Sequence, residues 1–299
     1  MKVSAACLPC MVHRAYKEVC HATDDPALRL KVMMEVAKLL AREFGPDAVP
    51  AVVGTKRDRL VKALTGNPDP YKAIKEASNK AAMRIRPWAE ELIERASGPY
   101  GRFRKACLCA IVGNAMEFDI LGHEFGFEDL RALIEGAEEN MAIDDVKAVY
   151  DAVRRARKVL YLTDNAGEIA FDVLLVHEIR SLGPEVTVAV KSKPCINDAL
   201  MEDALAVGMD EAADHLITTG TDSVGLVLEW ASSECLRAYK EADIVIAKGM
   251  GNIETLTEYK HDKPVAFLLY TKCETIADHL GVERGKCVAI LWEPGTKVQ

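Results

Sequence analysis

The sequence lacks any apolar run long enough to cross a membrane, and it lacks an excess of basic residues. No stretch reaches the ~18 to 20 uninterrupted apolar residues of a transmembrane helix. Lysine and arginine number 38 against 46 aspartate and glutamate, a formal net charge of −8, so we expect no broad basic surface for nucleic acid. Cys7, Pro9 and Cys10 interrupt the N-terminus before the apolar segment of a signal peptide forms. These absences indicate a cytoplasmic protein that binds neither membrane nor nucleic acid.

Short cofactor signatures are missing too. The chain has no Walker A loop and no complete G-x-G-x-x-G fingerprint, and its seven histidines show no ligand spacing such as His-x-x-x-His. The nine cysteines are odd in number, which favours reduced, catalytic or metal-binding thiols over a secreted disulfide framework. A functional site therefore has to be sought among dispersed polar residues.

What is present is a change of pattern near Lys158. Before it the chain is helical, with helices expected at 28–44 and 55–64 and a third opened by Asp69-Pro70-Tyr71, which Pro87 is expected to kink or end. After it short apolar runs alternate with helical segments, as a mostly parallel sheet covered on both faces requires. The predicted strands are 158–163, 185–191, 214–218, 243–247, 264–270 and 287–292.

This pattern predicts an α/β protein with three parts. An N-terminal all-helical cap domain would occupy residues 1–98, and a helical connecting region at 99–157 would line the cleft. Residues 158–299 would form a three-layer α/β/α domain with a mostly parallel sheet that binds metal and substrate.

The first predicted strand ends in the polar cluster Asp164-Asn165-Ala166-Gly167-Glu168. Open α/β sheets bind ligands beside the carboxyl ends of their strands, and Asp and Asn oxygens are hard ligands for a cation such as Mg²⁺ or Mn²⁺. Taken alone, such a junction is more often plain structure, with Asp164 or Asn165 capping the following helix.

Polar residues also follow the next strands, and parallel strands would bring these loops to one edge of the sheet. Carboxylates with lysines and free backbone N–H groups suit a divalent metal together with a phosphate. The residues expected at this edge are Asp164, Glu168, Asp198, Asp222, Lys191, Lys272 and the turn Lys248-Gly249-Met250-Gly251-Asn252.

These motifs, in this order, resemble the metal-dependent damage-control phosphatases. That family was long catalogued only as a domain of unknown function, and it has one branch described as acidic-residue methyltransferases and another fused to pantothenate kinase. Cys7-Leu8-Pro9-Cys10 resembles the compact branch of archaea and other microbes. The matching set covers essentially the whole chain and comprises Gly113-Asn114, Asp164 to Glu168, Lys191-x-x-Pro194-x-x-Asn197-Asp198, Lys248-Gly249-x-Gly251-Asn252-x-Glu254 and Lys272-Cys273.

The resemblance implies a metal-dependent phosphomonoester hydrolase acting on small phosphorylated metabolites, either sugar phosphates or damaged phospho-metabolites. It implies that Asp164, Asn165 and Asp198 form the catalytic centre and hold Mg²⁺, Mn²⁺, Co²⁺ or Ni²⁺. Some branches carry an Arg-Gly-x-x-Lys motif, of which this chain keeps Lys272 but has Leu268 in place of the arginine. The implied substrate contacts are Asn114, Glu168, Lys248, Gly249, Gly251, Asn252 and Lys272, to which we add Lys191 from its place at a strand end.

Several interpretations stay open at this point. A metal-activated water could attack phosphorus, or Asp164 could attack as a nucleophile; the absence of an Asp-x-Asp motif after the first strand favours water. A second activity is S-adenosylmethionine-dependent carboxyl methyl transfer, although no Gly-rich loop follows that strand. A third is a non-catalytic metal or redox protein built on Cys7 and Cys10, whose spacing suits a second metal, a disulfide or no bond.

Overall fold

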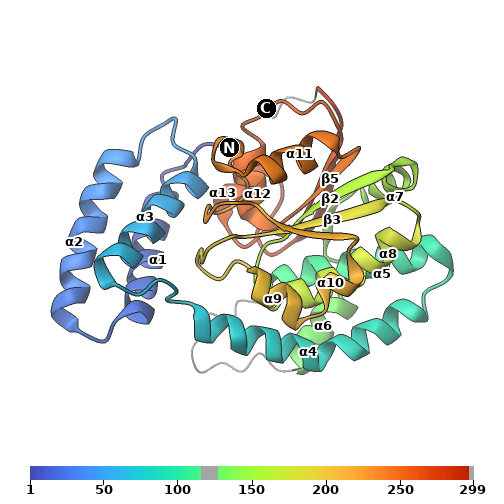
Figure 1. Cartoon of the computed structure of the whole chain (residues 1–299), viewed down its shortest axis with the longest axis horizontal. Helices are drawn as coiled ribbons and strands as arrows, with labels where there is room; N and C mark the ends of the chain where they lie inside the picture. Colours follow the sequence, from blue (N-terminus) through green and yellow to red (C-terminus); the bar gives the residue numbers. More distant parts are fainter. Residues whose placement is uncertain (116–126, 296–299) are drawn as a thin grey trace.

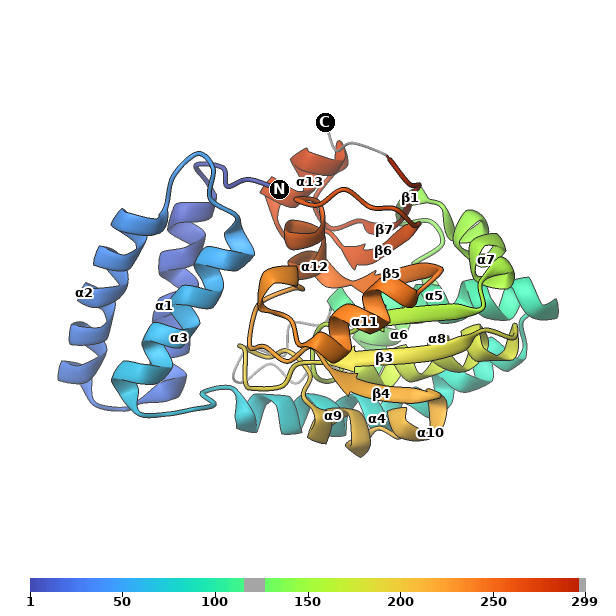
Figure 2. The same ribbon diagram turned by 45° about the horizontal axis from the view of Figure 1, so that its top comes forward.

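The structure, a computed structural model, describes residues 1–115 and 127–295. Within these residues a seven-stranded sheet runs in the order β1-β7-β6-β5-β2-β3-β4 (Figure 1, Figure 2). All neighbours are parallel except β6 and β7. The strands are β1 (Met141–Asp144), β2 (Lys158–Leu162), β3 (Glu185–Val190), β4 (His215–Thr218), β5 (Ile244–Lys248), β6 (Val265–Tyr270) and β7 (Cys287–Trp292). The predicted α/β class with a mostly parallel sheet is confirmed.

Six strands coincide with the predicted ones, and β1 is an addition within the region 99–157 that we expected to be helical. β1 has only four residues, of which Met141 and Ile143 are half-buried and the other two are exposed. It is an edge strand of the described sheet and pairs with β7 alone. A run this short and this weakly apolar carries no clear strand pattern in the sequence.

Helices cover both faces of the sheet. Successive residues of a strand point to opposite faces, so Val159 and Tyr161 of β2 enter one core while Leu160 and Leu162 enter the other. The first face carries α4 (Lys72–Glu94), α5 (Gly98–Ala115), α7 (Val146–Arg155) and α8 (Ile169–Ser181), and the second carries α11 (Ser233–Glu241), α12 (Gly249–Leu256) and α13 (Glu274–Leu280). The shorter elements are α6 (Phe127–Glu135), α9 (Met201–Ala206), α10 (Met209–Ala212) and η1 (Leu228–Trp230). This is the predicted three-layer arrangement.

The first three helices form a separate small bundle with a core of its own. They are α1 (Cys7–Ala22), α2 (Pro26–Glu43) and α3 (Pro50–Thr65), and Val19, Val36 and Val61 are among the side chains buried between them. Asp25 caps α2 by accepting a hydrogen bond from the backbone N–H of Ala27 at 2.9 Å. The bundle lies beside the sheet, with α3 nearer to it than α2 (Figure 2).

The helix α4 continues past Pro87 to Glu94, so of the two alternatives expected at Pro87, a kink or an end, the end is wrong. Ala82, Ile85 and Ala89, on both sides of the proline, are buried in the core shared with α5 and α8. Packing on this face outweighs the hydrogen bond that proline removes. The core of the bundle therefore ends before α4, earlier than residue 98. None of the described helices has the length and apolar content needed to span a bilayer.

Candidate active site

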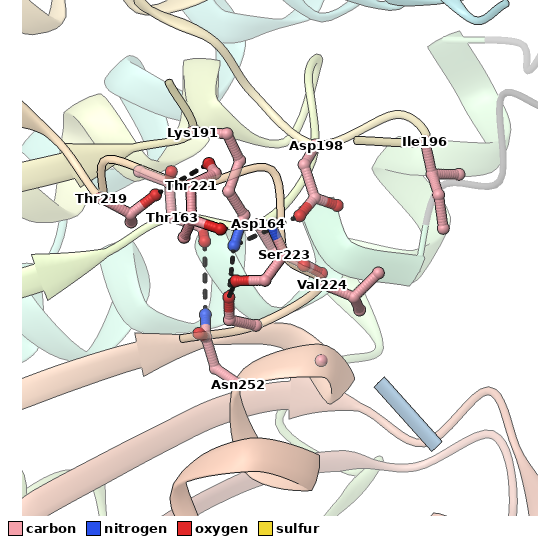
Figure 3. Close-up of polar contacts among 12 residues, drawn as sticks. Thr163, Asp164, Lys191, Ile196, Asp198, Thr219, Thr221, Ser223, Val224 and Asn252 are labelled. Atoms are coloured by element: carbon pink, nitrogen blue, oxygen red, sulfur yellow. Dashed lines mark hydrogen bonds and ion pairs between the residues drawn. The ribbon is translucent and has the colours of Figure 1, made fainter. Parts of the chain in front are cut away.

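The loops after β2 and β3 pair with each other and bring Asp164 beside Asp198. The backbone N–H of Ala199 donates to the carbonyl of Asp164 at 2.8 Å, and that of Ala166 donates to the carbonyl of Asn197 at 2.9 Å. Asn165 and Asp198 form an isolated antiparallel bridge between the loops. Figure 3 shows the two aspartates close together in the loops that follow their strands. The sheet edge predicted from the sequence therefore exists, and it gathers these residues.

Two amide side chains orient the acidic groups of this edge. The Nδ2 atom of Asn114, at the end of α5, donates to Asp164 Oδ2 and to Glu168 Oε2, both at 2.7 Å. The Nδ2 atom of Asn165 donates to the same two oxygens at 2.8 and 2.9 Å. The backbone N–H of Tyr270 in turn donates to Asn114 Oδ1 at 3.3 Å. Asn114 thus contacts the site from the helical part of the chain, as predicted, and it does so by fixing carboxylates.

Lys248 lies beneath the site and is fully buried. Its Nζ donates to the carbonyl of Ala110 at 2.9 Å, to Glu168 Oε1 at 2.6 Å and to Asp172 Oδ1 at 2.8 Å, and Tyr161 donates to the same Asp172 oxygen at 2.7 Å. An ammonium group has three hydrogens, so no donor of Lys248 remains for a ligand. The structure makes this lysine a support for Glu168, where we expected a substrate contact.

Lys191 is also buried, with 3% of its surface exposed. Its Nζ donates to the carbonyl of Gly225 at 2.7 Å and lies 3.5 Å from Asp198 Oδ2. The hydroxyl of Ser223 donates to the same carbonyl at 3.1 Å (Figure 3). Lys191 therefore ties the loop after β4 to Asp198, and its charge faces the site without reaching the surface.

The two glycines of the Lys248–Asn252 turn allow close approach by protein atoms. Gly249 has φ +73°, and a Cβ atom there would overlap Oδ2 of Asp164. A Cβ atom at Gly251 would lie 2.8 Å from Val224 Cγ1 and 3.0 Å from the nitrogen of Gly225. The side chain of Asn252 donates to the carbonyls of Thr163 and Lys248 at 3.3 and 2.8 Å. The turn is packed against the site, and the substrate contact that the resemblance implies for it stays a prediction.

Lys272 is the lysine of the predicted set that stays free. It is half-buried, and no hydrogen bond or ion pair joins its side chain to the described part of the chain. Its charge lowers the pKa of both Asp164 and Glu168, so it lies close enough to act on them. This side chain is available to an anion at the site.

Burial raises the pKa of both aspartates that face each other. The pKa of Asp164 rises to about 6 because of burial and the neighbouring charge of Glu168, and that of Asp198 rises to about 7 because of burial and the charge of Asp164, with Lys191 opposing. Burial would also raise the pKa of Glu168, but the charge and hydrogen bond of Lys248 outweigh it and hold that pKa below its usual value. The positive charges of the nearby lysines therefore do not fully offset the effect of burial on the pKa values of Asp164 and Asp198.

This donor set fits a divalent cation. Asp198 Oδ2 is buried and receives no hydrogen bond from the residues that the structure describes, although buried carboxylate oxygens ordinarily have a partner. Across residues 1–115 and 127–295, no three His, Cys, Asp or Glu side chains group as metal ligands. A cation would be held by the carboxylates of Asp164 and Asp198 and the amide oxygen of Asn165, the set expected from the sequence.

Comparison with known proteins identifies the family. The family model for the damage-control phosphatase ARMT1-like domain matches residues 3–288. This chain belongs to that family. It is 36% identical over 290 residues to a damage-control phosphatase of Archaeoglobus fulgidus, covering 97% of this chain and 99% of the relative. It is 37% identical to a damage-control phosphatase of Pyrococcus horikoshii, covering 97% and 98%.

A solved structure agrees with the fold of this family member. The crystal structure of a DUF89 family protein from Pyrococcus horikoshii superposes with a TM-score of 0.87 at 36% identity, covering 97% of this chain and 99% of that one. The predicted resemblance to the damage-control phosphatases is therefore confirmed. Membership supports a phosphatase of metabolite repair as the activity of the chain.

Cys7 and Cys10 are free thiols in this family member, the first buried and the second exposed. The sulfur of Cys7 lies 3.4 Å from the backbone nitrogen of Ser4 and 3.5 Å from Thr275 Oγ1. Cys7 therefore packs where the bundle meets α13. The structure contains neither the disulfide nor, in the described residues, the third ligand that a metal at these cysteines would need.

The sequence analysis missed a row of polar side chains on α3 that faces this site. We call Thr55, Asp58, Arg59 and Lys62 the α3 polar stripe. Its spacing of three, four and seven residues places all four on one helix face, a signal that was present in the sequence. A cavity of about 480 Å³, lined by Lys62, Lys193, Pro194 and Asp222 among others, borders the stripe and does not include Asp164 or Asp198.

Proposed function

We propose that this family member is a metal-dependent phosphatase that hydrolyses small phosphorylated metabolites, such as sugar phosphates or damaged phospho-metabolites. The observation that carries the proposal is the pair Asp164 and Asp198. Two neighbouring loops hold these carboxylates together by backbone hydrogen bonds, and burial raises both pKa values. Among the described residues Asp198 Oδ2 receives no hydrogen bond, and its positive neighbour is the ammonium group of Lys191 at 3.5 Å. Burying two neighbouring carboxylates costs free energy unless they bind a positively charged ligand.

Asp164, Asn165 and Asp198 would hold Mg²⁺, Mn²⁺, Co²⁺ or Ni²⁺, because these cations accept carboxylate and amide oxygens. When bound, the cation supplies the positive charge that polarises a phosphoryl oxygen and makes water a nucleophile near neutral pH. Asn114 and Asn165 orient the ligand carboxylate Asp164 through the donors of their amide groups. We favour water over Asp164 as the nucleophile, since Oδ2 of Asp164 is occupied by these two amide donors.

Positive charge for the substrate would come from Lys272. It is the lysine at this edge without a partner in the described part of the chain, and its charge already acts on Asp164 and Glu168. A free ammonium group can bind a phosphate and offset the charge that develops as the bond to phosphorus breaks. Lys248 would act indirectly, because its three donors keep Glu168 ionised and in place.

Hydrolysis of p-nitrophenyl phosphate by chelator-treated protein tests the proposal. We expect no activity without metal, activity on adding back Mg²⁺, Mn²⁺, Co²⁺ or Ni²⁺, and a fall in kcat/KM of at least about 100-fold in Asp164→Ala. A panel of sugar phosphates would then be compared under the best metal.

Asp151→Ala is the matched control, because Asp151 is an exposed carboxylate paired with Lys147 on α7, at 2.5 Å and away from the sheet edge. Its activity should equal that of the wild type. Full activity in chelated protein, or in Asp164→Ala, would show that the two aspartates do not form a metal-dependent centre.

A further inference from the structure

The loop that carries Asp198 contains a strained residue. Ile196 has φ +48° and is the one non-glycine residue with positive φ in residues 1–115 and 127–295. A side chain branched at Cβ rarely adopts this conformation, so something outside the residue has to hold it. Asp198 follows two positions later, and its backbone N–H closes a turn onto the carbonyl of Cys195 at 2.9 Å. The strain therefore lies within the turn that presents Asp198.

An ion pair on α3 holds both sides of this strained segment. Asp58 Oδ1 accepts a hydrogen bond from the backbone N–H of Ile196 at 3.3 Å, and Lys62 Nζ donates to the carbonyl of Pro194. Asp58 and Lys62 lie one helical turn apart and pair with each other at 2.6 Å. Two backbone groups, one on each side of Cys195, are thus bound by one carboxylate and one ammonium group from a different helix.

Burial shows that this contact is more than a surface attachment. Asp58 is completely buried, and the side chain of Lys62 is 13% exposed. Buried charges are expensive and are tolerated where they are paired and hydrogen-bonded. Removing either partner would leave the other buried charge with less compensation, so the pair and the segment 194–196 are expected to behave as one unit.

The other two members of the α3 polar stripe bind a different loop. Thr55 Oγ1 accepts from the backbone N–H of Val224 at 3.0 Å, and Arg59 Nε donates to Asp222 Oδ1 at 3.0 Å. These contacts attach the bundle to the loop after β4, which supplies none of the candidate metal ligands. Within the stripe, only Asp58 and Lys62 bind the loop after β3, and that loop carries the candidate metal ligand Asp198.

We propose that Asp58 and Lys62 are positioning residues that hold Ile196 at positive φ and so keep the carboxylate of Asp198 facing Asp164. Within the α3 polar stripe this pair is the part bound to the loop that carries Asp198, and its hydrogen bonds go to the backbone of Pro194 and Ile196 and not to a candidate metal ligand. The proposal rests on the proposed function for its effect on metal binding. The effect on the loop itself is independent of that function and can be measured separately.

Two measurements on Asp58→Ala test the proposal. In metal-free protein, hydrogen exchange of the segment 195–199 should become at least about tenfold faster, because opening this loop no longer breaks the bond to Asp58. The dissociation constant for Mn²⁺, measured by calorimetry, should rise by about 10- to 100-fold, the usual cost of losing a partner that orients a ligand. Asp58→Asn keeps an acceptor oxygen for Ile196 and should restore both values to within a few-fold of the wild type.

Lys56→Ala is the matched control. Lys56 is on the same helix and pairs with Glu43 inside the bundle at 2.5 Å, so its loss perturbs α3 without touching the loop. Exchange at 195–199 and Mn²⁺ affinity should both stay unchanged. Should Asp58→Ala fail to fold, Lys62→Met makes the same test, since it removes the donor to Pro194 and leaves Asp58 in place.

A double substitution distinguishes positioning from general destabilisation. Glycine adopts positive φ readily, so Ile196→Gly should make the loop less dependent on Asp58, and Asp58→Ala should then weaken Mn²⁺ binding by less than about threefold. Unchanged exchange and affinity in Asp58→Ala would overturn the proposal. If the wild type binds no Mn²⁺, the proposed metal site fails, and the exchange comparison alone decides whether the ion pair holds the loop.

Discussion

At Gly249 the backbone lies close to the carboxylate of the candidate metal ligand Asp164. Its φ of +73° suits glycine, and any Cβ atom would overlap the carboxylate. We expect Gly249→Ala to displace Asp164, with a loss of phosphatase activity and of Mn²⁺ affinity of at least about 100-fold. The variant should also lose about 1 to 2 kcal/mol of unfolding free energy, since alanine is strained at this φ. Calorimetric Mn²⁺ titration and urea unfolding measure the two effects.

Gly281 is the control that separates steric displacement from backbone strain. It caps α13 at φ +66°, and a Cβ atom there would meet nothing within 4 Å. Gly281→Ala should lose a similar amount of stability and keep full Mn²⁺ affinity. Equal affinities in the two alanine variants would mean that Asp164 moves freely and is not held by the Lys248–Asn252 turn.

At the scale of single residues, the sequence predicts a site residue best where a strand ends. Asp164 and Asn165 follow β2 closely, Asp198 lies in the loop after β3, and the structure brings them together as expected. Whether these residues bind metal stays a prediction. The position of the Lys248 side chain could not be predicted from the sequence, because a lysine at a strand end can point to solvent or into the core. Here the choice depends on Asp172 and Tyr161, which no local pattern connects to it.

The contact between the strand β5 and the helix α8 depends on one buried ammonium group, that of Lys248. Lys248, the last residue of β5, binds Glu168 and Asp172 at the start of α8, and all three side chains are fully buried. Lys248→Met leaves two carboxylates with no cation between them, so we expect a loss of roughly 3 to 5 kcal/mol in unfolding free energy. Urea denaturation at pH 7 measures it. Lowering the pH should reduce the loss, because protonation of Asp172 relieves the repulsion.

Lys158→Met is the matched control for that variant. Lys158 also lies at a strand end, the first residue of β2, and pairs with Glu241 at 2.6 Å in an exposed position. Exposed ion pairs contribute little to stability, so this variant should unfold at the wild-type urea concentration. If Lys248→Met also kept its midpoint, the buried lysine would not be what joins the strand to the helix.

At the scale of elements, prediction succeeded where burial on both faces makes a run almost wholly apolar. The central strands β2, β3, β5 and β6 have this character. It failed for β1, whose edge position allows exposed residues. It also could not choose between a kink and an end of the helix at Pro87, because the contacts that let α4 run through the proline come from α5 and α8. Long-range packing decides such cases, and local patterns do not contain it.

At the scale of the whole molecule, α3 joins two cores. Arg57 points into the bundle and binds Glu18 of α1 at 3.3 Å, while the next residue, Asp58, binds the loop of Asp198. The bundle and the site therefore share one helix. A change in charge inside the bundle is expected to alter the stability of the element that supports the site.

Ionisation of Glu18 should make the stability of the bundle that contains α3 depend on pH. Burial, together with the nearby charge of Asp58, raises the pKa of Glu18 from 4.5 to about 8, although Arg57 opposes the shift. Its Oε1 receives no hydrogen bond within the described chain. The folded state then binds a proton more tightly than the unfolded state. The corresponding stability is complete below about pH 4.5 and is lost as the pH rises through about 8, with a slope of up to about 1.4 kcal/mol per pH unit.

Glu18→Gln cannot ionise, so its unfolding free energy should lack this slope. We expect it to lie within about 1 kcal/mol of the wild type in urea unfolding at pH 5 and to exceed it by roughly 4 kcal/mol at pH 8.5. Glu35→Gln, which alters an exposed pair with Lys38 on α2, should follow the wild-type profile. The opposite order at pH 8.5, with the wild type more stable, would mean that attraction between Glu18 and Arg57 exceeds the cost of burying their charges. In that case alkaline pH would stabilise the helical bundle that contains Asp58. It would then not weaken metal binding through α3.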